Sequence, residues 1–406
     1  MIKRVFRYLA FFSVIRSKIG LFGALKYSVS RLLSKGLNVT LMIANPDPVE
    51  SFKFICAEPF GDDDSVVDRK VINWIIPDFG IGSGGHLNIF RVIKKLEEKG
   101  LVCRINIDGK THFTSGDDAR KCIRENFFPI DAEVSLGRSG LMAADATFAT
   151  GWTTAYTVRD FRGAGKKYYF VQDFEPYFFA QGSEYSFAEE TYRFGFKAIT
   201  AGAWLSDKLS KNYNMEAIPF GFSYDRELYF PRTRLDVSKK RIFFYARSIT
   251  PRRAFELGLL ALSQVHKADP EIEFVLAGWD MSGYEIPFPF QNAGVVSIDE
   301  LPDLYSQCDL ALVISLTNLS LLPLEVMACG CAVVSNKGPN VEWLLDEAFT
   351  KFSNSSPEAL SDAMLDLVND PVMLDKYKKE GLKFAQSTNW NAEVDKIASI
   401  IESDVG

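Results

Sequence analysis

Short apolar runs alternate with longer amphipathic stretches along most of the chain, and Gly, Pro, Asn and Asp separate them. The run Val71–Ile76 has the apolar character of a buried strand, and His86–Lys99 repeats apolar residues at the period of a helix after the turn Gly80–Gly85. A second apolar run, Leu101–Ile107, follows directly. Strand, helix and strand in this order predict a β-α-β unit with parallel strands.

The same alternation continues to the end of the chain and predicts an α/β fold of two doubly wound, Rossmann-like domains. Further strands are expected at 146–149, 168–172, 198–201, 241–246, 273–277, 310–314 and 332–335, with helices at 254–267, 301–307 and 323–328. The polar, non-periodic residues Pro231–Arg234 suggest a hinge, so we expect one domain over 71–235 and a second over 236–388. Ligands of such folds bind in the cleft outside the carboxyl ends of the strands.

Composition narrows the class of protein. With 406 residues and 47% hydrophobic content, the chain is too long for one ordinary core and suits two domains. A formal net charge of -6 argues against a nucleic-acid-binding protein. The six cysteines have no paired spacing, which favours a reducing, cytoplasmic compartment. The three histidines are scattered, so no metal site is expected.

The first 70 residues form a separate case, which we interpret as a basic helical N-terminal extension. Residues 1–46 contain no Asp or Glu, and their charged residues are Lys3, Arg4, Arg7, Arg16, Lys18, Lys26, Arg31 and Lys35. This segment either packs on the first domain as a cap or docks on an anionic membrane surface, such as the inner face of the plasma membrane. No run of 18 apolar residues occurs, so no spanning helix is predicted. Asp62, Asp63 and Asp64 are expected to form a solvated loop.

The segment Ser315–Val334 carries the most informative chemistry. A strand leads into a polar loop, Ser320 is placed to cap a helix, and Glu325 lies in the first helical turn. The free N–H groups of such a helix start can bind a diphosphate, which leaves Glu325 to accept hydrogen bonds from a ribose. The alternative is an ordinary strand–helix connection in which Glu325 only complements the helix dipole.

This segment resembles the signature of glycosyltransferase family 4, E-G-F-G-L-P-x-x-E-A-M-A-C-G-x-P-V-V, and Glu325 matches its second glutamate. Upstream, Ala246–Phe255 resembles the family's G-R-x-x-x-x-K-G stretch with one inserted residue. The resemblance implies that Arg247 and Arg253 are the cations that bind the diphosphate, with Arg252 competing for the second role. Arginine suits this task because its planar guanidinium binds phosphate oxygens bidentately.

Other landmarks occur in the family's order. Ile218–Asp225 resembles its I-P-N-G-V-D linker, Gly278 ends a V-L-A-G strand, and Gly294–Leu301 resembles the loop beside the nucleobase. Trp390 resembles the tryptophan that precedes a last helix, here 389–406, which returns to the first domain. The resemblance implies a GT-B fold with the acceptor in the first domain and the donor nucleotide in the second, and retaining transfer without a metal or other cofactor. The residues it implies for the donor are Gly84, Gly85, Arg247, Arg252, Arg253, Gly278, Val296, Ser320, Leu321, Leu322 and Glu325.

One departure concerns the sugar. Thr317 occupies the position of the family's first glutamate, which is associated with donor-sugar hydroxyls. This disfavours the usual hexose donors and favours a deoxysugar. The stretch Tyr169–Phe178 resembles bacterial rhamnosyltransferases that build S-layer or O-antigen rhamnan from dTDP-rhamnose. The expected partners are therefore a nucleoside-diphosphate sugar and a lipid-linked or oligosaccharide acceptor.

Acceptor residues are expected after the strand at 168–172. Either Asp173 or Glu175 could orient or deprotonate an acceptor hydroxyl, or Asp173 could merely cap a turn. The expected acceptor residues are Gln172, Asp173, Glu175 and Tyr177, and the expected catalytic residues are Asp173, Arg247 and Arg253.

A rival interpretation uses the glycines before the first helix. Gly80, Gly82 and Gly85 fit G-x-G-x-x-G, and Asp108 ends the next strand, as in NAD-dependent oxidoreductases. We favour a transferase glycine loop that approaches the donor, because the oxidoreductase reading leaves the second domain unexplained. A GT-B-fold sugar-nucleotide epimerase and a non-catalytic carbohydrate-binding subunit remain further alternatives.

Overall fold

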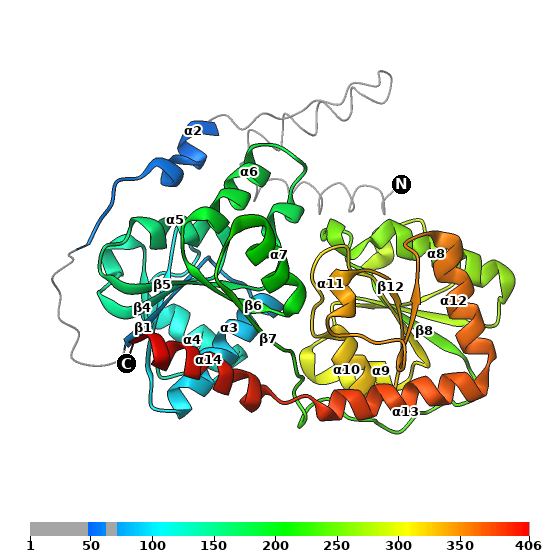
Figure 1. Ribbon diagram of the computed structural model, residues 1–406. Helices are drawn as coiled ribbons and strands as arrows, with labels where there is room; N and C mark the ends of the chain where they lie inside the picture. The colour runs from blue at the N-terminus through cyan, green and yellow to red at the C-terminus, as the bar shows by residue number, and fades with distance from the viewer. Residues whose placement is uncertain (1–47, 62–70, 406) are drawn as a thin grey trace, which may run out of the picture. The chain divides into compact units, whose positions relative to one another are not determined.

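The computed structural model describes residues 48–61 and 71–405 (Figure 1). The cap or membrane dock expected at residues 1–46 and the loop Asp62–Asp64 lie outside these ranges. The chain divides into two compact units, Met1–Cys56 and Ala57–Gly406. The described part of the first unit holds the short helix α2 (Pro48–Ser51) and a 3-10 helix at Lys53–Cys56. No helix in the described ranges has the length and apolar character needed to cross a bilayer.

The second unit contains two parallel sheets, and the first fills its N-terminal half. In the described residues this sheet has seven strands in the order β3-β2-β1-β4-β5-β6-β7. The strands are β1 (Val71–Ile76), β2 (Val102–Ile107), β3 (Glu133–Leu136), β4 (Ala144–Ala149), β5 (Ala164–Val171), β6 (Lys197–Ala201) and β7 (Ala217–Phe220). The helices are α3 (Gly84–Glu98), α4 (Gly116–Asn126), α5 (Trp152–Asp160), α6 (Ser183–Glu190) and α7 (Ala203–Tyr213), with a 3-10 helix η3 (Glu175–Phe178) after β5.

The second sheet fills the C-terminal half of the same unit. Within the described residues its six strands follow the order β10-β9-β8-β11-β12-β13. They are β8 (Arg241–Tyr245), β9 (Glu273–Ala277), β10 (Gln291–Gly294), β11 (Leu310–Val313), β12 (Ala332–Asn336) and β13 (Thr350–Ser353). The helices are η5 (Pro251–Arg253), α8 (Phe255–Ala268), α9 (Leu301–Ser306), α10 (Leu322–Ala328), α11 (Pro339–Glu342), α12 (Pro357–Asn369), α13 (Pro371–Ser387) and α14 (Trp390–Val405).

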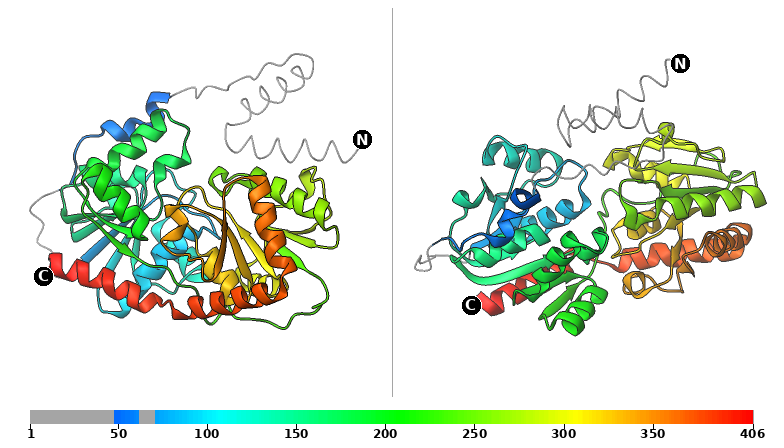
Figure 2. Two further views of the ribbon diagram at one scale, coloured as in Figure 1. Left: turned by 45° about the vertical axis from the view of Figure 1, so that its right-hand side comes forward. Right: turned by 90° about the horizontal axis from the view of Figure 1, so that it is seen from above.

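Central strands are buried on both faces because helices cover the sheet from either side (Figure 2). All six residues of β1 are buried. The ring of Trp74 stacks on Phe148 at 4.4 Å between centroids and meets Phe170 edge-on at 5.6 Å. Phe148 in turn stacks on Tyr168 at 4.6 Å. This aromatic layer ties β1, β4 and β5 together, and the carboxyl ends of β1 and β5 lead to residues of the candidate site.

The last helix packs on the first sheet rather than the second. Asp404 of α14 accepts hydrogen bonds from the Tyr168 hydroxyl at 2.7 Å and from the Lys197 ammonium at 2.8 Å. Near the start of α14, Glu393 accepts a bond from the backbone N–H of Gly221 at 2.6 Å. Helix α13 instead packs against α10 and β12 of the second half. The chain therefore passes between the halves twice, at 221–240 and at 388–389.

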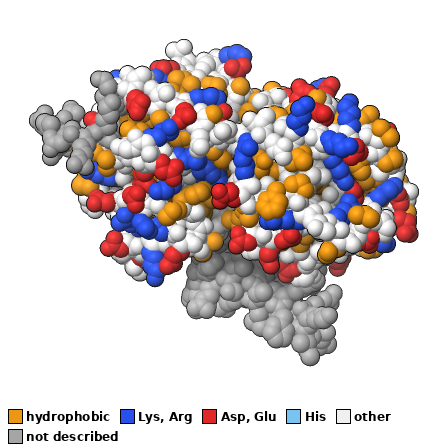
Figure 3. Space-filling view, turned by 90° about the horizontal axis from the view of Figure 1, so that it is seen from below, with side chains coloured by type: hydrophobic (Ala, Val, Ile, Leu, Met, Phe, Trp, Pro, Cys, Tyr) orange, Lys and Arg blue, Asp and Glu red, His pale blue; other side chains and the backbone are white. Residues whose placement is uncertain are grey.

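The expected hinge Pro231–Arg234 is bonded to the second half. Both carboxylate oxygens of Asp309 accept hydrogen bonds from the Arg234 guanidinium, and Lys378 adds a third at 2.6 Å. These partners hold the pKa of Asp309 below its usual value although burial opposes this. The backbone N–H of Arg232 also donates to Ser306 at 2.9 Å. On the face shown in Figure 3, basic and acidic side chains are interspersed with apolar ones.

The predicted central elements are confirmed, and the missed strands are the edges. Strands at 71–76 and 273–277 agree residue for residue with β1 and β9, whereas β3, β7, β10 and β13 were not predicted. Each of these four has four residues and forms an edge of its sheet in the described structure. Edge strands are short and half-exposed, so they lack the continuous apolar run of a buried strand.

Gly258 gives a test of packing inside α8. A Cβ at this position would lie 2.1 Å from the ring of Phe244, a contact that forces the core to shift. We expect Gly258→Ala to lower the free energy of unfolding by about 1–3 kcal/mol, although Ala normally stabilises a helix by about 1 kcal/mol over Gly. Urea unfolding measures the change.

The matched control is Gly381→Ala in α13. Its Cβ would meet the flexible side chain of Met327 at 3.1 Å, so we expect a smaller loss or none. Stabilisation by Gly258→Ala would contradict the packing described here.

Candidate active site

A carboxylate from the first half bonds to a loop of the second half. Asp173 follows β5, and its Oδ2 accepts a hydrogen bond from the Thr317 hydroxyl at 2.8 Å. Its Oδ1 accepts the backbone N–H groups of Asn318 at 2.9 Å and of Phe174 at 2.8 Å. Burial raises the pKa of Asp173, which the nearby Arg253 opposes. We refer to Asp173, Thr317 and Asn318 as the clasp.

Asn318 completes the clasp from the loop after β11, and its side chain is fully buried. Its amide nitrogen donates to the carbonyl oxygens of Gln172 at 2.9 Å and Ala201 at 2.7 Å. Its amide oxygen accepts from the Trp343 indole at 2.8 Å. Both the nitrogen and the oxygen of the amide have hydrogen-bond partners. The clasp is therefore rigid, and it requires an amide side chain at this position.

Two arginines of η5 lie beside the clasp. The Arg252 Nε is 3.5 Å from Asp173 Oδ2, and its guanidinium lies 4.2 Å from the centre of the Phe178 ring. The Arg253 Nη1 donates to the Ser315 hydroxyl and to the Asn318 carbonyl at 3.0 Å. Burial lowers the pKa of Arg253 to about 10, so the group stays cationic at neutral pH.

The third arginine, Arg247, begins the same loop after β8. Its Nη1 donates to the Tyr245 hydroxyl at 3.1 Å. The Tyr245 ring lies against Gly278, where a Cβ would be 2.4 Å from the ring and where φ is +103°. Gly278 is therefore required for the position of Tyr245, which in turn positions Arg247. Val296, from the loop after β10, is partly buried against the core.

The expected helix cap at Ser320 is wrong. Helix α10 begins at Leu322 with Leu321 in the cap position and no side-chain cap bond. The reason is local burial, because Leu319 and Leu321 are buried and the Leu321 carbonyl accepts from the Leu324 and Glu325 backbone N–H groups at 2.9 and 3.1 Å.

Glu325 lies in the first turn of α10, as expected. Burial raises its pKa to about 7, which Arg91 of α3 and a hydrogen bond from Tyr229 oppose. Arg91 comes from the first half and is itself 6% exposed. Glu325 therefore faces groups of both halves, where a ribose could replace part of these contacts.

The glycine loop is joined to the acceptor side through Gln172. Its amide nitrogen donates to the Gly85 carbonyl at 3.0 Å, and its amide oxygen accepts from Asn88 at 3.2 Å. Gly84 is the exposed first residue of α3. Tyr177, at 44% exposure, presents its ring to solvent at the same sheet edge. The structure thus brings the glycines and the acceptor candidates to one edge.

Glu175 supports the fold around the site. Its carboxylate accepts the backbone N–H of Trp152, at the start of α5, at 2.7 Å and the Tyr169 hydroxyl at 3.0 Å. Burial raises the pKa of Glu175 to about 7. These bonds point into the first half, so a contact of Glu175 with an acceptor stays a prediction.

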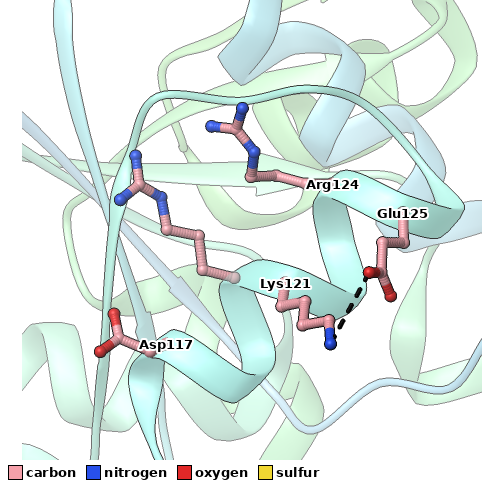
Figure 4. A pocket seen from close by; sticks show the side chains of 5 residues that line it. Asp117, Lys121, Arg124 and Glu125 are labelled. Atoms are coloured by element: carbon pink, nitrogen blue, oxygen red, sulfur yellow. Dashed lines mark ion pairs between the residues drawn. The ribbon is translucent and has the colours of Figure 1, made fainter.

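At two other candidate sites, charged groups are already bonded to neighbouring protein groups. Asp108 of the dinucleotide hypothesis accepts a hydrogen bond from the Thr157 hydroxyl at 2.6 Å. A hollow on α4 is lined by Asp117, Arg120, Lys121, Arg124 and Glu125 (Figure 4). Four of these five side chains already have partners, since Lys121 lies 3.9 Å from Glu125 and both arginines donate to backbone carbonyls. The described ranges contain no group of three or more His, Cys, Asp or Glu arranged to hold a metal ion.

Comparison with solved structures identifies the architecture. Anabaena HepE, solved with UDP and glucose, is 14% identical with a TM-score of 0.63, and the match covers 82% of this chain and 100% of that chain. Sucrose-phosphate synthase from Thermosynechococcus elongatus is 12% identical with a TM-score of 0.61, covering 82% and 99%. The fold is GT-B. The predicted fold class is thereby confirmed.

A family model and one relative match parts of this chain in sequence. Residues 240–365 match the family model described as WsaF, C-terminal domain. The O-antigen biosynthesis protein RfbC of Myxococcus xanthus is 32% identical over 338 residues, which is 81% of this chain. The chain spans about a quarter of that relative's length, 26%.

Sequence reasoning missed Asn318 and Trp343. Asn318 lies between Thr317 and Ser320 in a loop that the sequence marks as polar, but its partners Gln172 and Ala201 are more than 100 residues away. The polar loop after a buried strand was the available signal. This signal could indicate a site, but it could not identify Asn318 as the residue that joins the two halves there.

Glu175 gives a test of the buried carboxylates. Its pKa is raised from an ordinary value of 4.5 to about 7, so the folded state holds this proton more tightly than the unfolded state. Stability from this group is therefore present below about pH 4.5 and is lost as the pH rises to about 7, by at most about 3 kcal/mol. We expect the free energy of unfolding of the native protein, relative to Glu175→Gln, to fall across this range.

Urea unfolding at several pH values measures this difference, with exposed Glu184→Gln as the control. A difference between native protein and Glu175→Gln that is constant with pH, or that grows in favour of the native protein, would count against a raised pKa.

Proposed function

We propose that this protein is a glycosyltransferase that moves a sugar from a nucleoside diphosphate to a growing bacterial surface glycan. The observation that carries this proposal is the placement of Arg247, Arg252 and Arg253 on one loop beside the clasp of a GT-B fold. The name of the O-antigen biosynthesis relative supports the glycan as the product.

The arginines supply the charge that the reaction needs. During transfer the bond between the sugar C1 and the phosphate oxygen breaks, and negative charge grows on the departing diphosphate. Arg247 and Arg253 stabilise this charge, and Arg252 adds to it. Helix α10 has only seven residues, so its dipole is a minor contribution. We propose that no metal is required because the guanidinium groups already provide fixed positive charge.

The acceptor hydroxyl forms the new bond to C1 and gives its proton to an oxygen of the leaving phosphate. We propose retention of the anomeric configuration without a covalent enzyme intermediate. Asp173 is a poor nucleophile or base, because its oxygens already accept bonds from Phe174, Thr317 and Asn318. Its proposed role is to position Arg252 and the loop that carries Asn318.

We propose that the transferred sugar is rhamnose and that its donor is dTDP-rhamnose. Thr317 is 2% exposed, and its hydroxyl donates a hydrogen bond to Asp173. Position 317 therefore offers no free carboxylate to bind donor-sugar hydroxyls. A deoxysugar has fewer hydroxyls to satisfy. The proposed acceptor is an oligosaccharide or a lipid-linked glycan.

Nucleotide binding tests the donor. In buffer containing EDTA, we expect dTDP to raise the melting temperature more than UDP or GDP, because a ligand at 100 times its Kd adds about 2.7 kcal/mol of stability. A thermal-shift series over nucleotide concentration measures the order. A preference for GDP would remove the dTDP proposal, and stabilisation that needs Mg²⁺ would remove the metal-independent site.

Substitutions of Arg253 and Glu325 should change the kinetic constants in different ways. Arg253→Ala removes charge that matters most as the diphosphate departs, so we expect a lower kcat as well as a higher donor KM. Glu325→Gln weakens contacts with the unchanging ribose by about 1.5–3 kcal/mol, so donor KM should rise roughly 10- to 150-fold with little change in kcat. Steady-state kinetics with varied donor separates the two patterns.

The control for Glu325 is Glu256→Gln, an exposed carboxylate in the first turn of α8. Arg253→Lys tests whether charge alone suffices, since Arg253 also bonds Ser315 and Asn318. Unchanged donor KM and affinity in Glu325→Gln would show that the nucleotide lies elsewhere.

A further inference from the structure

Lys208 of α7 lies among aromatic rings on the acceptor side. Its ammonium is 4.3 Å from the centre of the Phe174 ring, 5.0 Å from Tyr177 and 6.0 Å from Trp204. It also donates a hydrogen bond to the Tyr177 hydroxyl at 3.2 Å. The side chain is half-buried, so its position is set by these contacts.

Lys208 has no carboxylate within 4.0 Å among the residues that the structure describes. The next lysine of the same helix, Lys211, pairs with Asp207 at 2.8 Å. Aromatic faces stabilise an ammonium without neutralising it, whereas a carboxylate cancels its charge. The positive charge of Lys208 therefore remains available to an incoming anion, which is not true of Lys211.

The surroundings of Lys208 connect directly to the arginine loop. Phe178, next to Tyr177 in η3, carries the Arg252 guanidinium 4.2 Å from its ring centre. Phe174 and Tyr177 follow β5, so the ammonium of Lys208 lies beside the chain that leaves the carboxyl end of this strand. Tyr177 and Phe178 are 44% and 37% exposed, which leaves aromatic surface open beside the cation.

We propose that Lys208, Tyr177 and Phe178 form an acceptor subsite for a sugar that carries a negatively charged group. The ring of the sugar packs on the exposed aromatic faces, and the anion pairs with Lys208. The anion has two possible sources, a phosphate that links the sugar to its carrier or the carboxylate of an acidic sugar. This inference rests on the proposed function, since it places the acceptor opposite the donor arginines.

The test measures binding of three probes to the full-length protein saturated with dTDP, which occupies the arginine site. The probes are glucose 1-phosphate, glucuronic acid and neutral glucose, followed by ligand-observed NMR titration. We expect a charged probe to bind at least about 10-fold more tightly than glucose. Tighter binding of glucose 1-phosphate identifies a phosphate-linked acceptor, and tighter binding of glucuronic acid identifies an acidic sugar.

Lys208→Met keeps the apolar stem and removes the charge, so the preference for charged probes should disappear while glucose binding stays the same. Lys211→Met is the matched control on the same helix and should keep the preference. Tyr177→Leu should weaken all three probes and leave the preference intact. These effects separate a charge pair from general damage to the fold.

Equal binding of charged and neutral probes, no binding of any probe to the dTDP-saturated protein, or a preference that survives Lys208→Met would each overturn the subsite. Failure of the native protein to bind dTDP, UDP and GDP would instead overturn the proposed function. The two failures are therefore distinguishable.

Discussion

The hydrogen bonds that Asp173 accepts from Thr317 and Asn318 are the interaction on which the site depends. A carboxylate is costly to bury, which raises the pKa of Asp173, and here three hydrogen bonds and two nearby arginines offset part of the cost. Because Thr317 and Asn318 come from the second half and Asp173 from the first, their bonds fix how the two strand edges meet. Loss of one partner would leave buried polar groups unpaired, so the arrangement is specific as well as stable.

The residues around the clasp divide into those that we propose to contact substrate and those that support them. Arg247 donates a hydrogen bond to Tyr245. The ring of Tyr245 can take its position because Gly278 has no Cβ. Glu175 accepts hydrogen bonds from the start of α5 and from Tyr169, and Asp173 accepts hydrogen bonds within the clasp, so both carboxylates after β5 are already bonded to protein groups. This division agrees with the proposed transferase mechanism, in which fixed cations stabilise the leaving group. The chemistry needs charge at the leaving group more than it needs a base.

Much of the fold could be predicted from the sequence, because central strands buried on both faces leave continuous apolar runs. The four edge strands could not, since β10 (Gln291–Gly294) reads as a polar loop and β7 (Ala217–Phe220) contains a proline, which edge strands tolerate. The arginine loop was found only through resemblance to a family motif. The partners of Asp173 and Asn318 could not be found at all, because they depend on contacts between residues more than 100 positions apart.

We propose that the donor nucleotide lies in the second half, with its diphosphate on the arginine loop and its ribose at Glu325. A crystal structure of the full-length protein with a bound nucleoside diphosphate tests this most directly. We expect phosphate oxygens within hydrogen-bonding distance of Arg247 and Arg253, and ribose hydroxyls beside Glu325. Phosphates bound instead at Gly80–Gly85, with the ribose turned toward Asp108, would contradict it.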